Sequence, residues 1–92
     1  MNDVAAKITV KGLVQGVGFR YFTHHHALKL GLKGYVKNLY SGDVETEVEG
    51  DRSMVEEFIS ILKAGPRSSR ITNVIVEWKP FTGKYKSFDI TF

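Results

Sequence analysis

Residues Gly12 to Arg20, with the sequence GLVQGVGFR, place three glycines and one arginine directly before a helix-like segment. A helix N-terminus carries unpaired amide groups and the positive end of the helix dipole, and both favour a bound anion. Gly16 and Gly18 can curl the backbone so that several amides face one oxyanion, and the planar guanidinium of Arg20 suits bidentate contact with phosphate. These residue types predict a pocket for one phosphate-sized group, formed by Gln15, Gly16, Val17, Gly18, Phe19 and Arg20.

Two nucleotide-binding motifs do not fit this stretch. A Walker A loop ends in Gly-Lys-Ser/Thr, but no lysine lies between Gly12 and Arg20. A dinucleotide-binding fingerprint that begins at Gly16 requires a third glycine where Tyr21 stands. A structural alternative remains, in which the glycines serve only a tight turn and Arg20 is a solvated residue of the first helical turn. Because arginine at that place opposes the helix dipole, a bound anion would compensate a local cost.

The elements that position this loop follow from the spacing of apolar residues. Apolar and polar residues that alternate predict strands, a spacing of three to four predicts helices, and glycine or proline marks the ends. The expected order is a strand at 7–11, a helix from 19 closed by Gly31, strands at 32–40 and 44–49, a helix that begins at Ser53 and ends before Gly65, and strands at 71–78 and 87–92. This order describes an α+β fold, a ferredoxin-like split β-α-β sandwich whose antiparallel sheet carries two helices on one face. We expect one domain that spans residues 1–92.

Two further expectations concern polar residues outside the loop. Ser53 followed by Glu56 fits a capping box at the start of the second helix. Glu45, Glu47 and Glu49 alternate with apolar residues in the strand at 44–49, which predicts a solvated face without a chemical role.

Composition limits the classes of function. With 13 Lys and Arg against 10 Asp and Glu, the net charge of +3 suits a small anionic partner rather than nucleic acid. The absence of cysteine excludes a disulfide framework, a thiolate nucleophile and cysteine-bound metal. No segment approaches the apolar length of a membrane span, so we expect a soluble, cytoplasmic protein. The sequence leaves the oligomeric state open, and a monomer is the default expectation.

The run LVQGVGFR, followed by GYVKNLYSGDVE, resembles the acylphosphatase family in order and spacing, and the resemblance covers nearly the whole chain. It implies hydrolysis of acyl phosphates, the mixed anhydrides of a carboxylic acid and phosphate, without metal or cofactor. It also implies that Arg20 binds the phosphate, that residues 15–19 cradle it, and that Asn38 orients the attacking water. The leaving carboxylate has a conjugate acid with a pKa of about 4, so it needs little help from a general acid. Inorganic phosphate is then the product and should inhibit competitively.

Other functions fit parts of the sequence. The run His24 to His26 suggests a metal, but adjacent helical residues point about 100° apart and lack the i, i+4 spacing of paired ligands. An RNA-recognition domain has the same order of elements. In this sequence, however, the third strand, at 44–49, carries three glutamates that would repel RNA. A nearer alternative is a non-catalytic module that binds acyl or carbamoyl phosphate. The resemblance allows it, since acylphosphatase-like domains also occur as modules of larger proteins that handle carbamoyl groups. Because the sequence ends at Phe92, we expect a free-standing enzyme.

Overall fold

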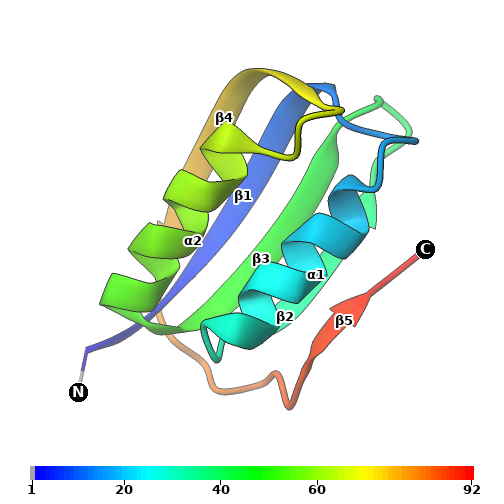
Figure 1. Ribbon diagram of the computed structural model, residues 1–92. Helices are drawn as coiled ribbons and strands as arrows, with labels where there is room; N and C mark the ends of the chain where they lie inside the picture. Colours follow the sequence, from blue (N-terminus) through cyan, green and yellow to red (C-terminus); the bar gives the residue numbers. More distant parts are fainter. Residues whose placement is uncertain (1) are drawn as a thin grey trace.

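The computed structural model describes residues 2–92. Its elements are β1 (Asp3–Leu13), α1 (Phe19–Lys29), β2 (Lys33–Asn38), β3 (Val44–Asp51), α2 (Arg52–Ala64), β4 (Arg70–Lys79) and β5 (Phe88–Ile90). The strands form one sheet in the order β4-β1-β3-β2-β5, and both helices cover the same face of that sheet (Figure 1). The expected ferredoxin-like α+β sandwich is confirmed.

The sheet has an antiparallel body and one parallel edge. Strand β1 pairs with β3 and β4, and β3 pairs with β2, all in antiparallel register as expected. Strand β5 instead lies parallel to β2, with Gly34 opposite Phe88, so the whole sheet is mixed. Parallel strands end at the same edge of a sheet, and the chain after β5 therefore runs toward the beginning of α1 (Figure 1).

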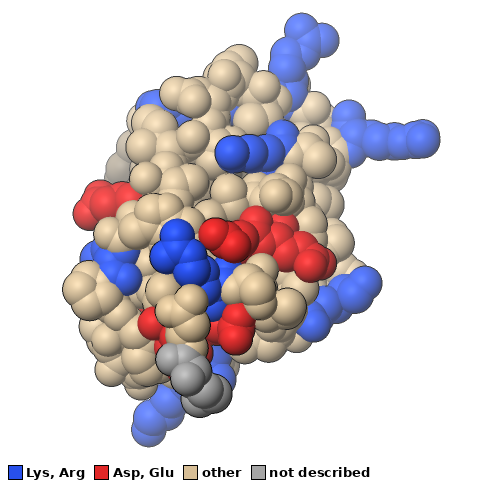
Figure 2. All heavy atoms as spheres, turned by 90° about the vertical axis from the view of Figure 1, so that its left-hand side faces the viewer, with Lys and Arg blue, Asp and Glu red and all other residues tan. Residues whose placement is uncertain are grey.

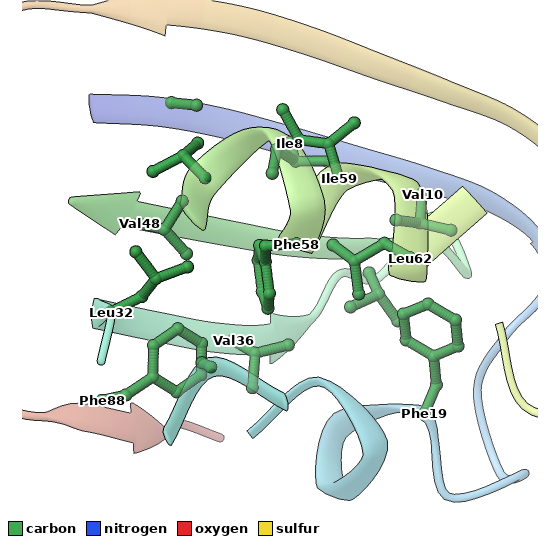
Figure 3. Close-up of a cluster of buried hydrophobic side chains, with 14 of the residues drawn as sticks. Ile8, Val10, Phe19, Leu32, Val36, Val48, Phe58, Ile59, Leu62 and Phe88 are labelled. Atoms are coloured by element: carbon green, nitrogen blue, oxygen red, sulfur yellow. The ribbon is translucent and has the colours of Figure 1, made fainter. Parts of the chain in front are cut away.

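The hydrophobic core lies between the helices and the sheet. Phe58 of α2 lies in the middle of the cluster in Figure 3, and its ring meets that of Phe88 edge-on with centroids 6.3 Å apart. Phe19, the first residue of α1, is fully buried at one end of the cluster. Because burying a large aromatic side chain contributes about 1.5–3 kcal/mol, Phe19 fixes the first turn of α1 against the core. The backbone of its neighbour Arg20 is placed by the same contact.

The second helix begins differently from the expectation. Asp51 is the residue that caps α2, and its Oδ1 accepts hydrogen bonds from the Ser53 amide at 2.8 Å and the Ser53 hydroxyl at 2.6 Å. The prediction that Ser53 itself caps the helix in a capping box is therefore wrong. An aspartate is an equally good acceptor for the free amides of a helix start. The hydrogen bonds from Ser53 lower the pKa of the Asp51 carboxyl.

The glutamates of β3 do not form a solvated face, so that prediction is wrong as well. Glu47 and Glu49 are only 6% and 4% exposed, because part of the segment between β4 and β5 covers them. Glu49 Oε2 accepts hydrogen bonds from the Thr82 amide at 3.0 Å and the Thr82 hydroxyl at 2.7 Å, while its Oε1 accepts one from the Gly83 amide at 2.9 Å. These bonds attach the segment 80–87 to the open side of the sheet.

Two tyrosines complete this polar network. Glu47 accepts hydrogen bonds from the Tyr85 hydroxyl at 2.9 Å and from Lys79 Nζ at 3.3 Å. Burial alone would raise the pKa of Glu47, but these bonds outweigh it, and the net shift of that pKa is downward. Glu45, which is half-buried, accepts a hydrogen bond from the Tyr35 hydroxyl. Burial, reinforced by the hydrogen-bonded carboxylates, raises the pKa of both tyrosines.

The surface shows no segregation of charge on the side seen in Figure 2. Acidic side chains lie among basic ones there, over α2, β4 and the beginning of β1. A nucleic-acid backbone requires a continuous basic surface, and this side does not offer one. Within residues 2–92, no helix has both the length and the apolar character needed to cross a membrane.

Candidate active site

The glycine-rich loop connects β1 to α1 and leaves the start of the helix open. Gly16 and Gly18 have positive φ angles of 75° and 78°, in the left-handed region that other residues rarely adopt. Gly18 is the N-cap of α1, no side chain caps the helix there, and its first turn holds no acidic residue. The first amides of α1 and the positive end of its dipole therefore remain for an anion.

A pocket of about 170 Å³, the phosphate-sized pocket, lies at this helix start. It is lined by Val14, Gly16, Gly18, Phe19, Arg20, Tyr21 and Asn38. Of the residues predicted to cradle phosphate, Gly16, Gly18, Phe19 and Arg20 line it, and Asn38 joins them from β2. Gln15 and Val17 do not line this pocket. The fold thus brings the two side chains predicted to be catalytic to one cavity, although Asn38 lies on a different element from the loop.

Gln15 has a role that the sequence analysis missed. Its side-chain Nε2 donates hydrogen bonds to the carbonyl oxygens of Leu39 at 2.7 Å and Asp43 at 2.8 Å. Leu39 directly follows Asn38 in the turn between β2 and β3, so Gln15 ties the loop to the segment that carries Asn38. These partners lie 24 and 28 residues away along the chain, and no local pattern points to them.

Val17 is attached to the rest of the molecule through its backbone. Its carbonyl oxygen accepts a hydrogen bond from the Ser68 hydroxyl at 3.0 Å. Ser68 lies in the connection between α2 and β4, so the glycine-rich loop is held on two sides. A loop fixed in this way can present amides in one geometry before any ligand arrives.

Asn38 is the last residue of β2 and carries an unusual acceptor. Its Oδ1 is buried, and no group of residues 2–92 donates a hydrogen bond to it. A buried polar atom without a partner costs about 1–3 kcal/mol, so this oxygen favours a donor from a water or a ligand. Asn38 lines the phosphate-sized pocket and also an adjoining one, so the residue that carries this oxygen borders both cavities.

Arg20 keeps its charge available. Within residues 2–92, no carboxylate forms an ion pair with its guanidinium. Nη1 donates a long hydrogen bond of 3.4 Å to the Thr91 carbonyl, and Cζ lies 4.7 Å from the centroid of the Phe92 ring. The guanidinium is therefore held by uncharged groups, and its charge is left for an anion in the pocket.

Two of the three adjacent histidines of α1 lie against different phenylalanine rings. The His24 ring is 6.0 Å from that of Phe88, and the half-buried His26 ring is 4.6 Å from that of Phe22. Burial chiefly lowers the pKa of His26, and the neighbouring His25 adds to the effect. In the described range, no three His, Asp or Glu side chains are grouped so that they could hold a metal ion.

The fold is a ferredoxin-like sandwich with a pocket at the open start of its first helix, and comparison with known proteins names the class to which it belongs. The acylphosphatase family model matches residues 6–90. The acylphosphatase of Vibrio parahaemolyticus serotype O3:K6 is 48% identical over 86 residues, which cover 90% of this chain and 96% of that protein. The crystal structure of acylphosphatase from Bacillus subtilis superposes with a TM-score of 0.93 at 36% identity, and covers 97% of this chain and 99% of that one. The chain belongs to the acylphosphatase family.

Family membership makes the chain a hydrolase of small acyl phosphates, with phosphate as a product. The same domain also occurs inside a longer protein. T. kodakarensis HypF superposes with a TM-score of 0.83 at 37% identity, and the match covers 97% of this chain but only 12% of HypF.

Proposed function

We propose that this chain hydrolyses acyl phosphates by direct in-line attack of water on the phosphoryl group. Arg20 and the amides of residues 15–20 bind the phosphoryl oxygens, and Asn38 orients the water opposite the leaving carboxylate. The observation that carries this proposal is the shared pocket, in which Arg20, the two loop glycines and Asn38 line one cavity of about 170 Å³.

The demands of the reaction match what these residues supply. Phosphoryl transfer passes through a loose transition state, so catalysis consists mainly of positioning and of stabilising charge on the equatorial oxygens. The guanidinium of Arg20 offers a planar fork of donors, and the open first turn of α1 offers amides. The amides are held in one place by the core, because Phe19 anchors the helix start there.

Asn38 acts on the nucleophile. A water that donates one hydrogen bond to Oδ1 satisfies this buried acceptor and can turn a lone pair toward phosphorus. The new P–O bond forms as the bond between phosphorus and the acyl oxygen breaks, and the carboxylate leaves with that electron pair. The residues that line the pocket include no His, Asp or Glu, so we propose that the proton of the water passes to a phosphoryl oxygen of the substrate.

The direct test is hydrolysis of benzoyl phosphate and acetyl phosphate by residues 1–92 with EDTA present. We expect turnover that EDTA does not change and that inorganic phosphate inhibits competitively. Phosphate binding without turnover would indicate a non-catalytic binding module and would overturn the proposal.

A further inference from the structure

Arg20 has an aromatic partner that lies outside the phosphate-sized pocket. The Phe92 ring lies with its centroid 4.7 Å from Arg20 Cζ, within the range of a cation–π contact. Arg20 lines the phosphate-sized pocket, whereas Phe92 lines the adjoining pocket and not the first. The guanidinium therefore contacts the ring and also belongs to the residue that lines the proposed anion site.

The backbone that presents this ring is fixed to the sheet. The Thr91 amide donates a hydrogen bond to the Val36 carbonyl at 2.8 Å, which continues the parallel pairing of β5 with β2. The Thr91 carbonyl accepts the bond from Arg20 Nη1. Beyond this point the Phe92 side chain is 93% exposed, so core packing does not explain where the ring lies. The ring instead lies close to the Arg20 guanidinium, which is its cation–π partner among residues 2–92.

We propose that Phe92 is a positioning residue that holds the Arg20 guanidinium in the plane needed to bind the phosphoryl group. This inference rests on the proposed function of Arg20. With Cζ over the Phe92 ring, the proposed arrangement has the ring against one face of the guanidinium. The donors in the guanidinium plane then stay free for bidentate contact with phosphate. Without the ring, the side chain can leave this plane, and each phosphate contact then costs more side-chain entropy.

A series of substitutions separates the aromatic face from bulk. Phe92→Leu keeps an apolar side chain without a π face, while Phe92→Tyr keeps the face. We expect Phe92→Leu to weaken phosphate binding about 3- to 10-fold and to raise KM by a similar factor, and Phe92→Tyr to bind like the unaltered chain. Tyr40→Leu is the matched control, since Tyr40 is exposed and lines the adjoining pocket but forms no cation–π pair with Arg20 within residues 2–92.

The readout is the Kd of inorganic phosphate from a chemical-shift titration, with Tm recorded for each variant. Equal affinities of Phe92→Leu and the unaltered chain would overturn the role of Phe92, and so would an equal loss in Phe92→Leu and Phe92→Tyr. Because phosphate binding is measured without substrate, this result is independent of turnover. A chain that binds phosphate but does not hydrolyse benzoyl phosphate would instead contradict the proposed function.

Discussion

Gln15 and Leu39 are joined by a hydrogen bond of 2.7 Å, from the side-chain amide of one to the backbone carbonyl of the other. The same amide donates to Asp43 at 2.8 Å, so one side chain spans the turn between β2 and β3. The loop that would hold phosphate and the residue that would hold water therefore keep a fixed relative position. In a reaction that depends on positioning, we expect this link to contribute to turnover.

Gln15→Met should therefore impair turnover more than phosphate binding. Methionine has a similar size but cannot donate, so the carbonyls of Leu39 and Asp43 each lose one donor and keep a backbone amide. For the two lost hydrogen bonds we expect a loss of about 1–3 kcal/mol in the free energy of unfolding. A displacement of Asn38 relative to the loop should lower kcat about 10- to 100-fold. Urea denaturation and kinetics with benzoyl phosphate measure the two effects. Ser68→Ala, which removes a bond to the same loop but not to the Asn38 segment, is the control and should leave kcat within about threefold.

Glu47→Gln should change how stability depends on pH. The folded-state pKa of Glu47 is lower than its ordinary value of 4.5. The ionised carboxylate therefore stabilises the folded state fully above pH 4.5, and this contribution is lost as pH falls through the folded-state pKa. At pH 7 the Gln variant should be less stable by about 1.5–3 kcal/mol, because a charged acceptor of hydrogen bonds is lost. The difference in Tm should shrink as the pH falls from 5 toward 3.

An exposed pair provides the comparison for this variant. Glu56→Gln removes an ion pair of 3.3 Å with Arg52 on the surface of α2, which should cost at most about 0.5 kcal/mol. If the two variants lost the same stability at pH 7, the buried network of Glu47 would not be what holds the segment 80–87.

Local pattern was sufficient for the elements and for the loop. Val55, Phe58, Ile59 and Leu62 form a stripe of helical period, and all four are buried in α2. The turn at the loop glycines was equally predictable from the sequence. Gly16 and Gly18 adopt left-handed conformations between the strand and the helix, and glycine is the residue that adopts them readily. The family resemblance then supplied Asn38, whose type and position alone do not separate it from an ordinary residue at a strand end.

Contacts between distant parts of the chain were not predictable in this way. Glu47 and Glu49 alternate with apolar residues as solvent-facing side chains do, and they are buried only because the segment 80–87 folds over them. The parallel pairing of β5 with β2 has the same origin, since a short edge strand carries no pattern that fixes its direction. That pairing matters for the site, because it brings Thr91 and Phe92 to Arg20.

Arg20→Ala should remove most of the phosphate affinity and nearly all turnover. Among residues 2–92, the guanidinium is the one permanent positive charge that lines the phosphate-sized pocket. Arg20→Lys keeps the charge but loses the planar fork, so it should recover only part of the binding. Competitive inhibition constants for inorganic phosphate measure this loss, and unchanged inhibition in Arg20→Ala would show that the anion binds elsewhere.

Asn38→Ala tests the central claim most directly, which is that one residue positions the water while others bind the phosphoryl group. The measurement is kcat for benzoyl phosphate, made together with the inhibition constant of inorganic phosphate. Asn73→Ala is the control, because this asparagine of β4 is exposed. Among the described residues, its side chain forms a hydrogen bond only with the adjacent Val74 amide, which donates to Oδ1. The account predicts that Asn38→Ala lowers kcat by about 10²–10³ and leaves phosphate inhibition unchanged. A kcat close to that of the unaltered chain, or an equal loss of phosphate binding, would contradict it.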